Sequence, residues 1–140
     1  MIINSTWQQL KQSWHRQYKA AEVLGENFVE PSALLKIYAI ECALKAILVK
    51  EARLRGVTEL NDFQDHDLRS FIRRLNVPAV QAAAIKRCRP RTGQGAPIEV
   101  PHLHQAWRYG QLLHESDERD LIEGLEGLHT WCVLRLGGSA

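Results

Sequence analysis

Apolar residues recur at steps of three and four positions along most of the chain, which is the spacing of one face of an α-helix. The first such stripe consists of Trp7, Leu10, Trp14, Tyr18 and Ala21. Ser5 and Gln8, at the start of this stripe, have the S-x-x-Q order of a capping box, in which each side chain accepts a hydrogen bond from the other residue's backbone N–H. We therefore predict a first helix that Ser5 opens and that Gly25 and Asn27 end.

The second segment, LLKIYAIECALKAILVKEARL (34–54), is apolar around most of a helical circumference. Such a pattern is typical of a central helix that packs on several sides. Proline suits the first turn of a helix, so Pro31 and Ser32 are predicted to start this one. Gly56 is predicted to end it.

The middle of the chain predicts shorter elements. A third helix carries the stripe Leu68, Phe71, Ile72 and Leu75, and Asp65 is its expected cap. Pro78 begins an alanine-rich turn. Residues 89–101 follow with three prolines and two glycines, a composition that excludes regular structure.

The last helix is predicted to start near Ser116 or Asp117, with Gly137 and Gly138 ending it. Its stripe consists of Leu121, Leu125, Leu128, Cys132 and Leu136. No strand-like alternation occurs elsewhere, and mostly short connections favour antiparallel neighbours. The pattern therefore predicts an all-α class, with an antiparallel bundle of four main helices plus short ones in a single domain spanning 1–140.

Composition adds few constraints. A chain of 140 residues with 45% hydrophobic and 24% charged residues has enough core to fold without a disulfide or a metal. Its three cysteines form no C-x-x-C pair, which favours free thiols and a cytoplasmic location. The N-terminus lacks a signal-peptide pattern, and charges interrupt the longest apolar run, so no membrane partner is expected. No cofactor motif is present.

The net charge of +2 is too small to indicate nucleic-acid binding, so only a local cluster of charge can do so. The segment KRCRPR contributes Lys86, Arg87, Arg89 and Arg91, with no acid among them. Arg69, Arg73 and Arg74 add a basic face on the third helix. Two interpretations stay open: a solvated surface, or a contact surface for the phosphates of RNA.

Charged and histidine residues suggest two further features. Glu41 and Lys45 lie on one face of the central helix, as an intrahelical ion pair or as part of a site or subunit interface. His66 lies between Asp65 and Asp67, where a carboxylate also suits a helix cap. The histidines His66, His102 and His104 could form a metal-binding sensor, but they make no closed ligand set, and no metal site is predicted.

Arg108 and His114 are the sharpest catalytic candidates. Arginine stabilises charge on a phosphate in the transition state, and histidine transfers protons near neutral pH. Together they would support metal-independent cleavage of RNA by the ribose 2′-hydroxyl. On a straight helix the two side chains lie about 120° apart, and Gly110 between them is a helix breaker.

Three segments, in this order, resemble the HEPN domain superfamily. YAIECALKAIL (38–48) resembles its E-x-x-L-K segment, DHDLRSF (65–71) its His-Asp-Leu segment, and WRYG (107–110) the Arg-Tyr element before its last helix. The resemblance spans about residues 5 to 136.

The resemblance implies a helical bundle that dimerises, in a superfamily rich in toxin–antitoxin and defence proteins with antitoxin or nucleotidyltransferase partners. It leaves two functions open. In one, Arg108 and His114 of two subunits form a metal-independent endoribonuclease. In the other, the module binds a nucleotide, a nucleic acid or a partner protein, Tyr109 packs inward, and Arg108 pairs with an acid such as Glu41.

Overall fold

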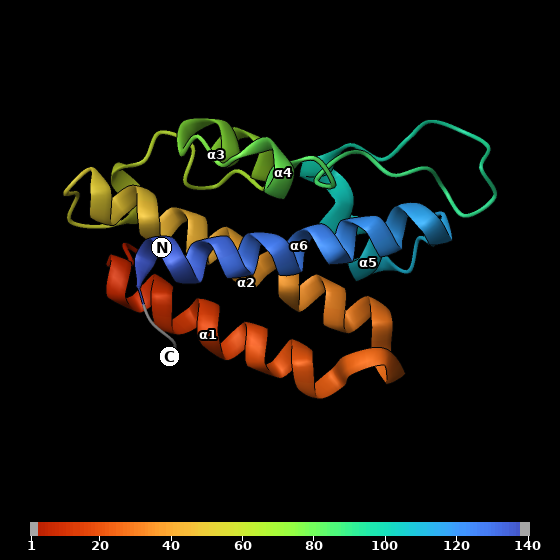
Figure 1. The fold of residues 1–140 in the computed structure, drawn as a ribbon, viewed down its shortest axis with the longest axis horizontal. Helices are drawn as coiled ribbons and strands as arrows, with labels where there is room; N and C mark the ends of the chain where they lie inside the picture. The colour runs from red at the N-terminus through yellow and green to blue at the C-terminus, as the bar shows by residue number, and fades with distance from the viewer. Residues whose placement is uncertain (1–2, 138–140) are drawn as a thin grey trace.

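The structure, a computed structural model, describes residues 3–137, and three long helices form its frame (Figure 1). They are α1 (Trp7–Leu24), α2 (Val29–Glu51) and α6 (Glu115–Leu136), of 18, 23 and 22 residues. Residues 3–137 contain no β-strand, only the isolated bridges Cys88↔Ile98 and Pro90↔Leu113. The predicted all-α class is confirmed. Within the same range, no helix combines the length and apolar character needed to cross a bilayer.

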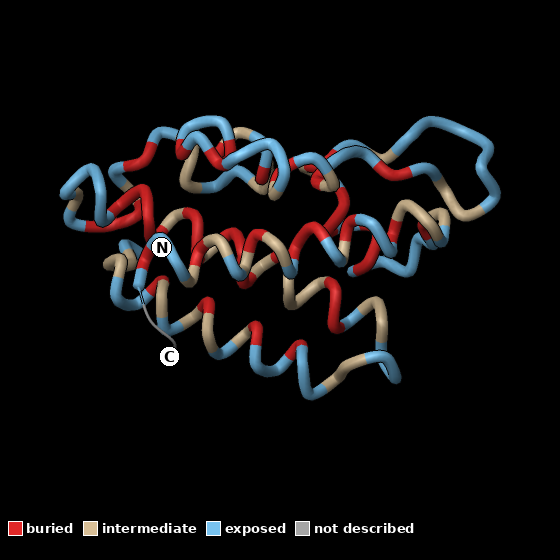
Figure 2. Tube along the Cα trace, in the orientation of Figure 1, coloured by how far each residue is buried: buried red, intermediate tan, exposed pale blue. Residues whose placement is uncertain are grey.

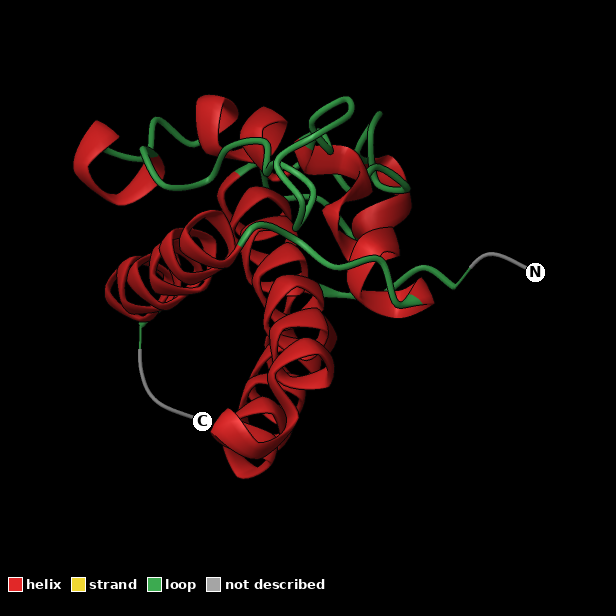
Figure 3. Ribbon diagram, turned by 90° about the vertical axis from the view of Figure 1, so that its right-hand side faces the viewer, coloured by secondary structure: helices red, strands yellow, loops and turns green. Residues whose placement is uncertain are grey.

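Short helices and loops occupy the side of α2 and α6 that faces away from α1 (Figures 1 and 3). They are η2 (Val57–Glu59), α3 (Leu68–Arg74), α4 (Ala79–Ala82), η3 (Val100–His102) and α5 (Leu103–Tyr109). The remaining short helix, η1 (Gly25–Phe28), joins α1 to α2. The segment 89–101 extends from this layer as a long loop, and the two isolated bridges fasten its ends.

Helix α2 is the centre of the bundle, as its all-round apolar pattern predicts, and burial runs along nearly its whole length (Figure 2). The directions of its neighbours differ. Lys36 pairs with Glu126 and Glu51 with Arg135, so α2 and α6 run in the same direction. Helix α1 runs antiparallel to both. The bundle is therefore only partly antiparallel, because the long α3–α5 connection returns the chain to the starting end of α2.

Helix starts differ from the predicted positions by one or two residues. Thr6, not Ser5, caps α1: the Gln9 N–H donates to Thr6 Oγ1 at 3.2 Å, and the Thr6 N–H donates to Gln9 Oε1 at 2.9 Å. The Ser5 carbonyl instead accepts a hydrogen bond from Val57 N–H. Tertiary contact at Ser5 thus moves the cap by one residue.

The other boundaries show the same pattern. Asp67, not Asp65, caps α3 by accepting from the Arg69 N–H. Helix α2 begins at Val29, before Pro31, because η1 leads directly into it, and it ends at Glu51 rather than Gly56. Helix α6 starts at Glu115 and ends before Gly137, as predicted for its C-terminus, while Gly138 lies outside the described residues.

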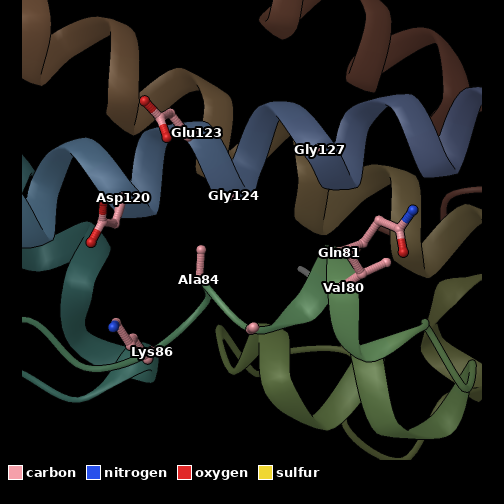
Figure 4. Close-up of a pocket in the computed structure, with 9 residues that line it drawn as sticks. Val80, Gln81, Ala84, Lys86, Asp120, Glu123, Gly124 and Gly127 are labelled. Atoms are coloured by element: carbon pink, nitrogen blue, oxygen red, sulfur yellow. The ribbon is translucent and has the colours of Figure 1, made fainter.

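Two glycines of α6 face different surroundings. Gly124 lies against Ala84, where a Cβ atom would come within 2.9 Å of the Ala84 Cβ and 3.1 Å of Ile85 Cδ1 (Figure 4). A Cβ on Gly127 would meet nothing within 4 Å. Both glycines border a groove of about 440 Å³ between α4 and α6.

This difference predicts opposite effects of one substitution on stability. Gly124→Ala is expected to lower the free energy of unfolding by about 1–3 kcal/mol, because the added methyl overpacks the contact with Ala84. Gly127→Ala is expected to raise it by about 0.5–1 kcal/mol, because alanine favours the helix. Urea denaturation of both variants measures the difference. Equal effects of the two substitutions would contradict the close packing at Gly124.

Candidate functional site

A cluster of ionisable side chains forms where α2, the segment before α3, and α5 meet. Glu41 accepts from His66, whose Nδ1 lies 3.0 Å from Oε2 and 3.2 Å from Oε1. The His66 ring lies against the His104 ring, with centroids 4.1 Å apart. The Tyr38 ring lies 6.3 Å from His66 and 5.9 Å from His104. We call these four residues the histidine cluster.

Each member of the histidine cluster is placed by a local feature of its own segment. Tyr38 and Glu41 are three positions apart on α2 and so lie on one face of it. His66 directly precedes Asp67, whose capping bond sets the entry to α3. His104 lies in the first turn of α5. The cluster therefore depends on three segments that only the folded chain brings together.

Lys45 does not pair with Glu41. Its ammonium donates to the Phe63 carbonyl at 2.6 Å, and this bond holds the loop that leads to His66. Among residues 3–137 the ion pair of Glu41 is with His66. The interpretation of Glu41 and Lys45 as an intrahelical ion pair is therefore wrong, because each side chain has a nearer partner on the returning loop.

Burial decides the electrostatics of the cluster. Burial raises the pKa of Glu41, and the charge of His66, its hydrogen bond and the charge of Lys45 act against this. Burial likewise lowers the pKa of His104, and the charges of His66, His102 and Arg108 lower it further. A hydrogen bond with the Pro101 backbone acts in the opposite direction. Nδ1 of His104 is buried and makes no hydrogen bond of good geometry within residues 3–137.

His66 is the member of the cluster that solvent reaches. Its side chain is 43% exposed, whereas that of Glu41 is 6% exposed. Nδ1 of His66 is occupied by Glu41, and within the described part of the chain Nε2 makes no hydrogen bond. The arrangement is an imidazole oriented by a buried carboxylate, with one nitrogen free to exchange a proton.

Arg108 lies one helical turn after His104, on the same face of α5. Its guanidinium lies over the Tyr109 ring, 5.5 Å from the centroid, and forms no ion pair among residues 3–137. Tyr109 is 73% exposed. The expected inward packing of Tyr109 and pairing of Arg108 with Glu41 are both wrong. Tyr109 is the exposed last residue of α5, before the left-handed turn at Gly110, and Glu41 pairs with His66 instead.

His114 lies apart from Arg108, immediately before α6. Its Nδ1 is 3.1 Å from Ser116 Oγ and 3.4 Å from Arg89 Nη2, and its backbone N–H donates to the Arg89 carbonyl. Within the described chain no hydrogen bond or ion pair joins Arg108 to His114. Their meeting across two subunits stays a prediction.

Acids distant in the sequence neutralise most of the predicted basic segment. Arg89 donates from Nε and Nη2 to Asp117, at 3.0 Å each, which holds the pKa of that carboxyl well below its usual range. Arg91 lies 3.7 Å from Glu115 and donates to the Leu113 carbonyl. These bonds fasten the base of the 89–101 loop to the start of α6.

The remaining two residues of the basic segment are less restrained. Arg87 lies 3.8 Å from Glu99 in an exposed pair, and Lys86 forms no ion pair within residues 3–137. No group of three or more His, Cys, Asp or Glu side chains in that range has the geometry to hold a metal ion. The structure thus gives the metal-sensor interpretation no support.

Tyr38 and the contact of His104 with His66 are features of the candidate site that the sequence patterns did not reveal. Two local spacings could have indicated them: Tyr38 and Glu41 lie three positions apart, and His104 and Arg108 lie four apart, so each pair shares one face of a helix. Neither a protein-family model, nor a curated protein, nor a solved structure matches the chain.

Proposed function

We propose that this chain is a HEPN-like protein of a toxin–antitoxin or defence system that cleaves single-stranded RNA without a metal ion. One observation carries the proposal: Arg108, free of acidic partners within residues 3–137, lies one helical turn from the histidine cluster. An unpaired guanidinium suits a phosphate, and a half-exposed imidazole held by a carboxylate suits proton transfer. The family resemblance supports the same substrate class.

In this proposal Arg108 binds the scissile phosphate and His66 is the general base. Nε2 of His66 accepts the proton of the ribose 2′-hydroxyl, whose oxygen attacks phosphorus. The bond to the 5′-oxygen breaks, and this leaving oxygen takes a proton from the His66 imidazolium or from water. The products are a 2′,3′-cyclic phosphate and a 5′-hydroxyl. Glu41 at Nδ1 holds the ring in the orientation that leaves Nε2 for the substrate.

In this proposal His66 transfers the proton, whereas the sequence alone predicted His114 for that role. Single substitutions distinguish these two mechanisms. With EDTA present and short single-stranded RNAs of varied sequence as substrates, His66→Ala and Arg108→Ala are each expected to lower the cleavage rate about 100-fold or more. His114→Ala is expected to retain the wild-type rate. Circular dichroism confirms that each variant is folded.

Three outcomes would overturn parts of this assignment. Loss of cleavage in His114→Ala with retention in His66→Ala would favour the Arg108–His114 pair acting across a dimer. Cleavage that EDTA abolishes would contradict the metal-independent mechanism. No cleavage of any RNA by the wild type would leave the binding function described next.

The second function is a non-catalytic module that binds a partner subunit, favoured by the exposed surface beside Arg108. Tyr109 is 73% and Leu112 48% exposed, and aromatic residues and arginine dominate the binding energy of many interfaces. The resemblance implies a second copy of the chain as the first occupant to test. Sedimentation at micromolar concentration is expected to give a dimer that Tyr109→Glu dissociates, and a monomeric wild type would contradict it.

A further inference from the structure

A cleft of about 350 Å³ lies between α3 and the segment 86–101, on the side of the bundle away from α1. Its charged lining consists of Arg69, Arg73, Lys86, Arg87, Asp67 and Glu99. Val100 and Pro101 contribute its apolar lining. The volume falls in the range of sites that take small ligands.

Two of the four cations are free to bind an anion. Neither Arg73 nor Lys86 forms an ion pair with any residue among 3–137, and both are exposed. Arg87 has only the long, exposed contact to Glu99, at 3.8 Å with side chains 67% and 59% exposed. Such a pair contributes little and is easily exchanged for another anion.

The other charges keep the cleft in shape. Arg69 donates from Nη1 to the Ile85 carbonyl, which ties α3 to the segment that carries Lys86 and Arg87. Asp67 is engaged in capping α3 through the Arg69 N–H. With four cations against two carboxylates, the cleft carries a net positive charge.

We infer that this cleft binds a phosphate group. The planar guanidinium of Arg73 can donate two parallel hydrogen bonds to phosphate oxygens. Lys86, which lies where this cleft meets the α4–α6 groove lined by Asp120 (Figure 4), adds a point charge. The phosphate has two sources: a free phosphomonoester, or the backbone of a strand. The strand source is favoured by chain connection, because Asp67 directly follows His66 and Pro101 lies three residues before His104.

Isothermal titration calorimetry at low salt tests the inference with adenosine 5′-monophosphate, inorganic phosphate and adenosine as probes. The two phosphates are expected to bind, and adenosine is expected to bind at least 10-fold more weakly than its monophosphate. Arg73→Glu and Lys86→Glu are each expected to weaken phosphate binding at least 10-fold. Lys19→Glu, the same charge reversal at an exposed position of α1, is the control and is expected to bind as the wild type does.

Equal binding of adenosine and its monophosphate would overturn the inference, as would equal weakening by the Lys19→Glu control or no binding of any phosphate probe. A six-nucleotide oligouridylate without terminal phosphates distinguishes the sources. If it binds and the same two variants weaken it, the phosphate comes from a strand; if only the small probes bind, it is a free phosphomonoester. The strand source rests on the proposed function, and the two proposals fail separately. Phosphate binding without RNA cleavage would contradict the cleavage proposal alone, and RNA cleavage without phosphate binding in this cleft would contradict the present inference alone.

Discussion

Trp14→Ala is expected to lower the free energy of unfolding by about 3–5 kcal/mol, a large part of the 5–15 kcal/mol typical of a domain. Trp14, on α1, is fully buried and reaches His129 of α6. Its indole stacks on His15 with centroids 4.2 Å apart, and Nε1 donates to His129 Nδ1 at 3.0 Å. The substitution leaves a cavity and removes the donor to His129.

Urea denaturation followed by circular dichroism measures this loss, and two further variants make the result interpretable. Trp14→Phe keeps most of the volume and removes only the N–H, so a cost of about 1–3 kcal/mol is expected. Trp131→Ala, at a half-buried tryptophan that lies under Arg135, is the control, with a smaller expected cost. A cost for Trp131→Ala equal to that for Trp14→Ala would contradict a core centred on Trp14.

Acidification is expected to destabilise the fold through His129. Burial lowers the pKa of this imidazole from its ordinary value of 6.5; Glu22 acts against this, and His15 and Lys36 add to it. The unfolded chain therefore takes up the proton at a pH where the folded chain does not. The stability that His129 contributes is complete above about pH 6.5 and is lost as the pH falls below it, because protonated Nδ1 cannot accept from Trp14.

The expected result is a fall in the free energy of unfolding below pH 6.5, with a slope of at most about 1.4 kcal/mol per pH unit for this one proton. Subtracting the same curve for His129→Gln isolates this contribution. The subtraction also cancels the effect of Glu41, whose raised pKa changes stability in the opposite direction. Tyr18→Phe keeps a ring stacked on His129 and should show the wild-type slope. Parallel curves for the wild type and His129→Gln would refute the assignment.

The helices were predictable because their signal is local. A buried face repeats every three to four residues whatever it packs against, so the stripes of α1, α2 and α6 could be read from the chain alone. The caps of α1 and α3 were predictable only to within one or two residues, and the end of α2 lies further from its predicted position at Gly56. Ser5 and Thr6 are chemically almost equivalent caps, and the bond from Val57 N–H to the Ser5 carbonyl decides between them.

The histidine cluster was only partly predictable. Glu41 was notable as a charged residue in the apolar central helix, and His66 as a histidine between two acids. Their hydrogen bond, however, joins residues 25 positions apart in the sequence. Local spacing favoured Lys45 as the partner of Glu41, since i and i+4 residues on a helix are neighbours. The folded chain instead offers Lys45 the Phe63 carbonyl and Glu41 the imidazole of His66.

The sequence by itself determined the all-α class, the central position of α2, and the break at Gly110 that separates Arg108 from the last helix. The tertiary structure alone decided the direction of α6 and the partner of each charge. Arg89 and Asp117, 28 positions apart, illustrate the reason. Hydrophobic periodicity is a property of each segment, whereas an ion pair or a cleft depends on which segments the packing brings within a few ångströms of each other.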